Sequence, residues 1–114
     1  MSTDCLFCKI ITGELPSEQV YSDETVVVFK DINPKAPIHL LIVPREHIIS
    51  LNELDNDDLT VHMMQLLPKL AKYQGLNGGF RTVINTGPAG GQIVFHLHIH
   101  LLGGGNLDGT GFAI

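Results

Sequence analysis

Three features are missing from this sequence of 114 residues: an excess of basic residues, a long apolar run and an internal repeat. The 7 basic residues are outnumbered by 12 acidic ones, and the net charge is -5. This charge argues against a general nucleic-acid binder, which normally presents a basic face. A small anionic ligand stays open, because backbone N–H groups and a few local cations can hold one. No apolar run approaches the roughly 20 residues that a membrane-spanning helix needs.

The start of the chain also lacks a secretory signal. Met1 to Cys5 contains no basic segment followed by a long apolar one, so the expected location is the cytoplasm. Hydrophobic residues make up 44% and charged residues 17% of the chain, an ordinary globular composition. We expect a single domain over residues 1–114, because a second domain would have too little apolar material for its own core.

Hydrophobic periodicity and turn residues predict an α+β fold, with an antiparallel five-stranded sheet, one long helix and a short N-terminal helix. The first predicted helix is Leu6 to Thr12, and the second runs from about Asp57 to Gln74. The predicted strands are Gln19 to Ser22, Thr25 to Lys30, His39 to Val43, Phe80 to Asn85 and Gln92 to Leu102. Gly103 to Gly111 is too rich in glycine for regular structure.

The long predicted helix has an apolar stripe and a capping residue. Asn56 or Asp57 can cap its N-terminus, and Pro68 should kink it locally because proline removes an N–H group. The residues of the stripe are Leu59, Met63, Leu66, Leu67 and Leu70. His62 lies away from this stripe and is interpreted as a surface residue.

The predicted last strand carries histidine at every second position. Side chains alternate between the two faces of a strand, so His96, His98 and His100 should form a row about 6.6–7 Å apart. The apolar residues between them, Phe95, Leu97, Ile99 and Leu101, should face the core. The outer face of an ordinary strand holds Thr, Lys or Glu, so scattered surface histidines are a poor explanation of this row.

Two functional interpretations of the row compete. In the first, the imidazoles chelate one catalytic metal ion, but three collinear imidazoles span too far for a single tetrahedral ion with bonds of about 2.0–2.1 Å. Alternatively, one histidine is a nucleophile that forms a covalent phospho-intermediate, and its neighbours position it or bind phosphate. The preceding loop, residues 85–92, favours the nucleophile, because its glycines allow backbone N–H groups to approach an anion and Asn85 adds a side-chain donor.

These motifs resemble the histidine-triad (HIT) family over nearly the whole chain. His96 to Leu102 is similar to the signature His-φ-His-φ-His-φ-φ, where φ is apolar. Asp31 to His39 resembles the family segment D-I-x-P-x-A-P-x-H, and Leu41 to His47 resembles its strand followed by Pro-x-x-His. Gly90-Gly91-Gln92 and the trailing Leu101 to Gly104 are similar to the Hint branch, the histidine-triad nucleotide-binding proteins.

The resemblance implies a purine nucleoside phosphoramidase that splits a P–N bond through a covalent nucleotidyl-histidine intermediate. His98 would attack the α-phosphorus, His100 would bind the phosphate, and His39 would help set the environment of His100. Asp31 would accept hydrogen bonds from the ribose hydroxyls, beside Ile32. The implied base slot consists of Phe7, Ile10, Leu15 and Phe29, and the implied phosphate contacts are Asn85, Gly91, Gln92 and Ile93.

Ile93 departs from the family pattern, which often has serine there to contact the leaving group. The second hypothesis is therefore a nucleotide-binding module with little turnover. The tail, Asn106 to Ile114, is unlike the better-known Hint tails, so the resemblance implies nothing for it. The resemblance also implies a homodimer, for which the long helix and the Leu-rich last strand are candidate interfaces.

Cys5 and Cys8 form a C-x-x-C motif with three interpretations. A redox motif would follow a strand, and only four residues precede Cys5. The pair can also be two small buried hydrophobic residues, or two ligands of a structural metal that needs two further N or S ligands. The family resemblance implies zinc completed by His47 and His96. A third functional hypothesis, a catalytic zinc on the histidine row, also remains.

Overall fold

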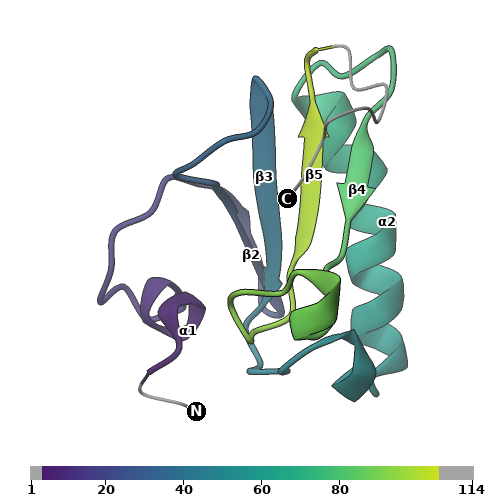
Figure 1. Ribbon diagram of the computed structural model, residues 1–114. Coiled ribbons are helices and arrows are strands. Elements are labelled where there is room, and N and C mark those ends of the chain that lie inside the picture. The colour runs from purple at the N-terminus through teal and green to yellow at the C-terminus, as the bar shows by residue number, and fades with distance from the viewer. Residues whose placement is uncertain (1–3, 106–114) are drawn as a thin grey trace.

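The computed structural model describes residues 4–105 and confirms the predicted α+β architecture (Figure 1). Two α-helices, α1 (Leu6–Ile11) and α2 (Asp57–Tyr73), accompany five strands. The strands are β1 (Gln19–Ser22), β2 (Val26–Lys30), β3 (Ile38–Pro44), β4 (Arg81–Val83) and β5 (Ile99–Gly103), with short 3-10 turns at Leu51–Glu53 and Pro88–Gly90. They form one sheet in the order β1-β2-β3-β5-β4, in which all neighbours are antiparallel.

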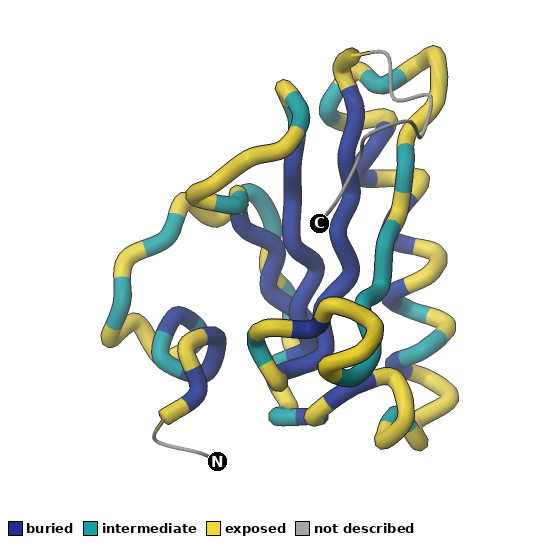
Figure 2. Tube along the Cα trace, in the orientation of Figure 1, coloured by how far each residue is buried: buried dark blue, intermediate teal, exposed yellow. Residues whose placement is uncertain are grey.

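The centre of the sheet is buried on both faces, and alternation along the strands sorts the side chains between two cores. One core lies under α2 and receives Val26, Val28, Leu40, Ile42, Ile99 and Leu101 from the sheet. The other lies on the α1 side and receives Val27, Phe29, Leu41 and Val43. Figure 2 shows the central strands buried along their length, whereas each turn of α2 has a buried side and an exposed side. The two sides of the sheet therefore have different partners.

Helix α2 forms where its apolar stripe and cap predict. The side chain of Asn56 accepts a hydrogen bond from the backbone N–H of Leu59 at 3.0 Å, which satisfies one of the free N–H groups of the first turn. The predicted stripe is buried, and the helix continues through Pro68. Within residues 4–105, no helix is both long and apolar enough to cross a bilayer.

The predicted strand over Gln92 to Leu102 is wrong in its first part, because β5 begins at Ile99. The backbone of this segment is held by the loop after β3 and not by a strand ladder: the N–H of Leu97 donates to the carbonyl of Ile48 at 2.6 Å. Phe95 is 42% exposed and does not face the core as predicted. Gly103, predicted to be irregular, is the last residue of β5, and residues 106–111 of the same prediction lie outside the described part.

Asp23, in the turn between β1 and β2, ties this hairpin to α2. One carboxylate oxygen accepts hydrogen bonds from the backbone N–H groups of Thr25 and Val26, both at 2.9 Å. The other accepts from the hydroxyl of Tyr21 at 2.7 Å and lies 2.6 Å from Nε2 of His62 on α2. Burial raises the pKa of Asp23, but these hydrogen bonds outweigh it and hold the pKa well below its usual range.

We expect Asp23→Asn to lower the free energy of unfolding by about 1–3 kcal/mol, because it removes a charged acceptor from several hydrogen bonds. The folded-state pKa of Asp23 is depressed, so its stabilising contribution is present above about pH 4 and is lost as the pH falls further. Urea denaturation of both proteins at pH 7 and pH 3 measures this. Glu24→Gln, an equal charge change at the exposed neighbour, is the control. Equal stability of wild type and Asp23→Asn at pH 7 would contradict this role.

Candidate functional site

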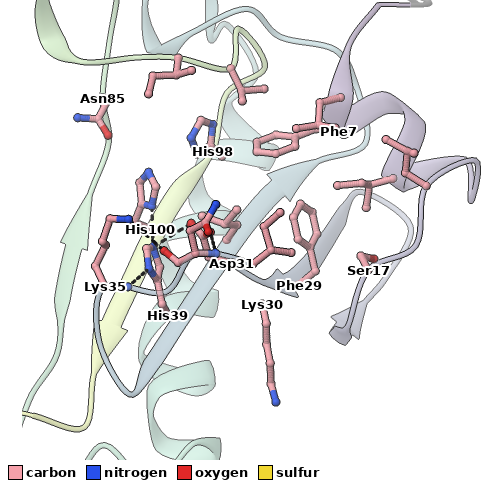
Figure 3. Close-up of a pocket in the computed structure, with 18 of the residues that line it drawn as sticks. Phe7, Ser17, Phe29, Lys30, Asp31, Lys35, His39, Asn85, His98 and His100 are labelled. Atoms are coloured by element: carbon pink, nitrogen blue, oxygen red, sulfur yellow. Dashed lines mark hydrogen bonds and ion pairs between the residues drawn. The ribbon is translucent and has the colours of Figure 1, made fainter. Parts of the chain in front are cut away.

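A cavity of about 470 Å³ lies on the α1 side of the sheet, and we call it the histidine cavity because His39, His98 and His100 line it (Figure 3). Every residue predicted to bind or transform a nucleotide lines this one cavity: Phe7, Ile10, Leu15, Phe29, Asp31, Ile32, His39, Asn85, Gly91, Gln92, Ile93, His98 and His100. These residues come from α1, from strands in the middle of the sheet and from loops, so the fold brings together segments distant in sequence.

His39 and His100 lie on neighbouring strands and form a hydrogen-bonded pair. In the antiparallel register His39 faces Leu102 and Leu41 faces His100, which sets the two imidazoles diagonally on one face of the sheet. The backbone N–H of Lys35 donates to Nδ1 of His39 at 3.0 Å, so the proton of the neutral His39 ring is on Nε2. That Nε2 lies 2.9 Å from Nδ1 of His100 and donates to it. The proton of His100 is consequently on Nε2.

His98 has the opposite tautomer. Its Nδ1 lies 2.7 Å from the carbonyl oxygen of His96, which can only accept, so Nδ1 carries the proton. The lone pair of the neutral ring is then on Nε2. The rings of His98 and His100 are 5.0 Å apart between centroids, and both line the cavity. The cavity therefore holds one imidazole with an available lone pair beside one with an available N–H donor.

The histidine row is buried, whereas strand alternation predicts it on a solvent-exposed face. His96, His98 and His100 are all nearly inaccessible, because the α1 segment covers this side of the sheet. Burial lowers the pKa of His98, although its hydrogen bond to His96 and the charge of Asp31 raise it. Burial, His98 and His39 together lower the pKa of His100 to about 4, against a smaller opposing effect of Asp31. His100 is accordingly neutral at pH 7.

One side of the cavity is apolar and aromatic. The rings of Phe7 and Phe29 meet edge to face with centroids 5.5 Å apart, and Phe7 also contacts the ring of His98 at 4.9 Å. Figure 3 shows both phenylalanines on the side of His98 that lies away from Asn85. This arrangement forms an apolar slot that ends at His98.

The glycine loop before the histidines has hydrogen bonds of its own. The side chain of Asn85 donates to the carbonyl of Gly90 at 2.9 Å. The N–H groups of Gly91 and Gln92 donate to the carbonyls of Pro88 and Gly87, so neither is available to a ligand in this conformation. Among the hydrogen bonds of residues 4–105, none uses the N–H of Ile93, whose side chain is 86% exposed.

Gln92 supports this loop more than it lines the cavity. Its buried side chain accepts from the N–H of Gly87 at 2.9 Å and donates to the carbonyls of Ile49 and Val94. Several residues that line the cavity are not predicted from the sequence: Leu6, Pro16, Ser17, Lys30, Asn33, Lys35, Leu41 and Val94. Lys35 matters most among them because its backbone sets the tautomer of His39. Its place inside the Asp31 to His39 motif was an available signal.

His96 leaves the row and joins a second cluster with Cys5, Cys8 and His47. Its Nε2 donates to the carbonyl of Pro44 at 2.7 Å, which leaves the lone pair on Nδ1. That Nδ1 lies 3.3 Å from Sγ of Cys5, 3.6 Å from Sγ of Cys8 and 3.2 Å from Nδ1 of His47. All four ligand atoms lie within 4.8 Å of one another. The cysteines are free thiols in this arrangement.

This Cys/His cluster is compatible with zinc. Tetrahedral zinc with Zn–N bonds of about 2.0–2.1 Å separates two nitrogen ligands by about 3.3 Å, close to the spacing between His47 and His96. Burial and the neighbouring Cys5 raise the pKa of Cys8 to about 11, so a pair of thiolates at this position requires a cation. Four protein ligands would close the coordination shell, and none of them lines the histidine cavity. A closed shell of four protein ligands is the arrangement found in structural zinc sites.

A second group of potential ligands, Asp31, His39 and His100, fits a metal less well. The nitrogens of His39 and His100 are 2.9 Å apart, which is hydrogen-bond distance and shorter than the spacing in a zinc site. The proton on Nε2 of His39 also occupies the position that a metal would take. These groups form a hydrogen-bond chain.

Comparison with known proteins gives a consistent result. The family model described as the HIT domain matches residues 12–107. Protein HitA of Neisseria gonorrhoeae is 51% identical over 102 residues, which are 88% of this chain and 95% of HitA. A 14 kDa zinc-binding protein of Zea mays is 42% identical over 107 residues, 90% of this chain and 84% of that protein.

Solved structures agree with the sequence relatives. A HIT family hydrolase from Clostridium thermocellum superposes with a TM-score of 0.90 at 45% identity, covering 94% of this chain and 96% of the hydrolase. A histidine triad nucleotide-binding protein from Candida albicans superposes with a TM-score of 0.81 at 34% identity, covering 86% of this chain and 73% of that one.

Proposed function

This chain belongs to the HIT domain family, and from that premise we propose that it is a purine nucleoside phosphoramidase, a hydrolase that acts at the α-phosphate through a nucleotidyl-His98 intermediate. The pair of opposite tautomers carries the proposal: a lone pair on Nε2 of His98 and an N–H on Nε2 of His100 share one cavity. A nucleophile beside a hydrogen-bond donor is what attack on a phosphoryl group requires. Relatives named as a HIT family hydrolase and a nucleotide-binding protein support it.

The proposed ligand lies along the cavity in three parts. The base occupies the slot that includes Phe7 and Phe29, where an aromatic ring is stabilised by burial and ring contacts. Asp31 accepts hydrogen bonds from the ribose hydroxyls: one carboxylate oxygen accepts from the N–H of Asn33, and the other, 3.5 Å from Nε2 of His39, has lone pairs for a hydroxyl. The α-phosphate then lies between His98 and His100, whose imidazoles stand at the end of the apolar slot.

In the first step, Nε2 of His98 forms a bond to the α-phosphorus and the P–N bond to the amine breaks. The amine leaves with the electron pair of that bond and takes a proton from solvent. The nucleotidyl-imidazole carries a positive charge, so the hydrogen bond from Nδ1 of His98 to the carbonyl of His96 becomes charge-assisted and stronger. This hydrogen bond stabilises the intermediate.

In the second step, the oxygen of a water molecule bonds to phosphorus and the bond to Nε2 of His98 breaks. The electron pair returns to the imidazole, and the water gives one proton to solvent, which balances the proton taken up earlier. The net products are a nucleoside monophosphate and an amine. The Nε2–H of His100 and the N–H of Ile93 donate to the phosphate oxygens as charge develops.

The test is incubation with adenosine 5′-phosphoramidate, followed by measurement of AMP and ammonia. Denaturing quench and mass spectrometry should find one adenylyl group on the peptide that contains His98. Two successive displacements each invert phosphorus, so a substrate chiral at phosphorus should give net retention. Hydrolysis with inversion and no adduct would exclude the covalent intermediate.

A nucleotide-binding module with little turnover is the second candidate, and Ile93 is the observation that favours it. Its side chain lines the cavity and is 86% exposed, but it offers no hydroxyl group to a leaving amine. Nucleotide affinity with no hydrolysis above background would support this candidate over the enzyme.

We expect Ile93→Ser to increase the turnover of adenosine phosphoramidate by about three- to tenfold, because a hydroxyl adds one hydrogen bond to the leaving group. AMP affinity should change less than twofold, since the backbone N–H remains. Steady-state kinetics and calorimetry measure the two quantities, with Ile93→Ala as the control for loss of the side chain alone. A turnover of the serine variant equal to that of the alanine variant would contradict the prediction.

We also propose a structural zinc at Cys5, Cys8, His47 and His96 and a homodimer. Leu101 and Leu102 are fully buried within the protomer, so the last strand offers no interface. Exposed apolar residues on α2, Val61 and Met64, support α2 as the surface between the two copies. Size-exclusion chromatography with light scattering gives the oligomeric state directly.

A further inference from the structure

The histidine cavity is lined by few charged side chains. Its charged lining residues are Lys30, Asp31 and Lys35, and burial lowers the pKa of both His39 and His100 so that they are neutral at pH 7. Lys30 forms an ion pair with Glu18, and Figure 3 shows its side chain pointing away from the histidines. In a protein of net charge -5, a second cation in this cavity would favour an anionic ligand, and Lys35 is the other lysine that lines it.

Lys35 is placed to supply that charge. Figure 3 shows it beside His39 and His100, on the side of the cavity away from Phe7 and Phe29. Its ammonium group donates one hydrogen bond, to the carbonyl of Asn33 at 3.2 Å, and within residues 4–105 it forms no ion pair with a carboxylate. An ammonium group has three donors, so two remain for a ligand.

We propose that Lys35 is a specificity-determining residue whose ammonium group binds a phosphate oxygen of the ligand and so makes the site prefer nucleotides to nucleosides. The inference rests on the proposed function, because it takes the ligand to be a nucleotide with its phosphate at His98 and His100. Lys35 then has two separate roles. Its backbone N–H fixes the tautomer of His39, and its side chain adds one positive charge to a cavity that also holds the carboxylate of Asp31.

The two roles can be separated by substitution, because every side-chain variant keeps the backbone N–H. We expect Lys35→Gln to weaken AMP binding about tenfold, the size of effect expected for one hydrogen bond between charged groups. The affinity for adenosine, which has no phosphate, should change less than twofold. Lys35→Arg keeps the charge and should stay within about threefold of wild type for AMP.

The experiment is calorimetry of AMP and adenosine binding to wild type, Lys35→Gln, Lys35→Arg and Lys69→Gln. Lys69 is exposed on α2, outside the cavity, so its variant makes the same change in net charge without touching the site. Raising the NaCl concentration from about 50 to about 500 mM shortens the screening length roughly threefold. This change should weaken AMP binding by wild type more than by Lys35→Gln.

The outcomes distinguish this inference from the proposed function. If Lys35→Gln binds AMP as tightly as wild type, or loses adenosine affinity to the same extent as AMP affinity, Lys35 does not recognise the phosphate and the inference fails. The proposed function is untouched by that result. If wild type binds neither AMP nor adenosine, the nucleotide site itself is wrong and both proposals fall.

Discussion

Replacement of His98 by asparagine should reduce the turnover of adenosine phosphoramidate by about 10⁴-fold or more, the scale on which enzymes lose activity without their nucleophile. Asparagine retains a side-chain N–H near the position of Nδ1, so the hydrogen bond to the carbonyl of His96 can persist. It lacks the Nε2 lone pair that would attack phosphorus. AMP affinity should therefore fall by much less than turnover, and single-turnover kinetics with calorimetry measure the two.

His62→Asn is the matched control for this substitution. His62 lies on α2, outside the histidine cavity, and its partner is Asp23 in the hairpin turn. It should keep wild-type turnover with a somewhat lower stability. Turnover by His98→Asn within tenfold of wild type would exclude His98 as the nucleophile, whatever the control shows.

Replacement of Cys8 by serine should abolish stoichiometric zinc and lower the free energy of unfolding by several kcal/mol. A structural zinc stabilises a folded domain by its binding free energy, and it is absent from the unfolded chain. Without a cation, this buried cluster loses the ion that would bind all four of its ligand atoms. Metal analysis and thermal unfolding measure both effects.

Chelator-treated wild type provides the internal control, because it loses zinc without losing a side chain. It should unfold at nearly the temperature of Cys8→Ser, and added zinc should restore the wild type alone. Phosphoramidase activity per folded molecule should largely survive chelation, since no zinc ligand lines the histidine cavity. Complete loss of activity from folded, chelated protein would favour the catalytic-zinc hypothesis instead.

Much of the fold followed from local patterns. The stripe and the Asn56 cap predicted α2 because a helix repeats every 3.6 residues and its first N–H groups need acceptors. The segments that carry the site were also recognisable, because residues with special chemistry stand at fixed spacing within them. All residues assigned to the nucleotide line one cavity, although their individual roles stay predictions.

Local patterns do not predict that His96 joins the Cys/His cluster while His98 and His100 line the cavity, because this division depends on contacts between distant segments. His96 turns towards Cys5, 91 residues away in sequence, and strand alternation cannot reveal that the backbone of Leu97 bonds to the loop after β3. The tautomers of His98 and His100 depend likewise on a backbone carbonyl and on His39 in the neighbouring strand. Residue order thus specified which chemical groups are present and the local elements that carry them. Packing of the chain decided which nitrogen bears each proton, because a neutral imidazole takes its tautomer from the partners around it.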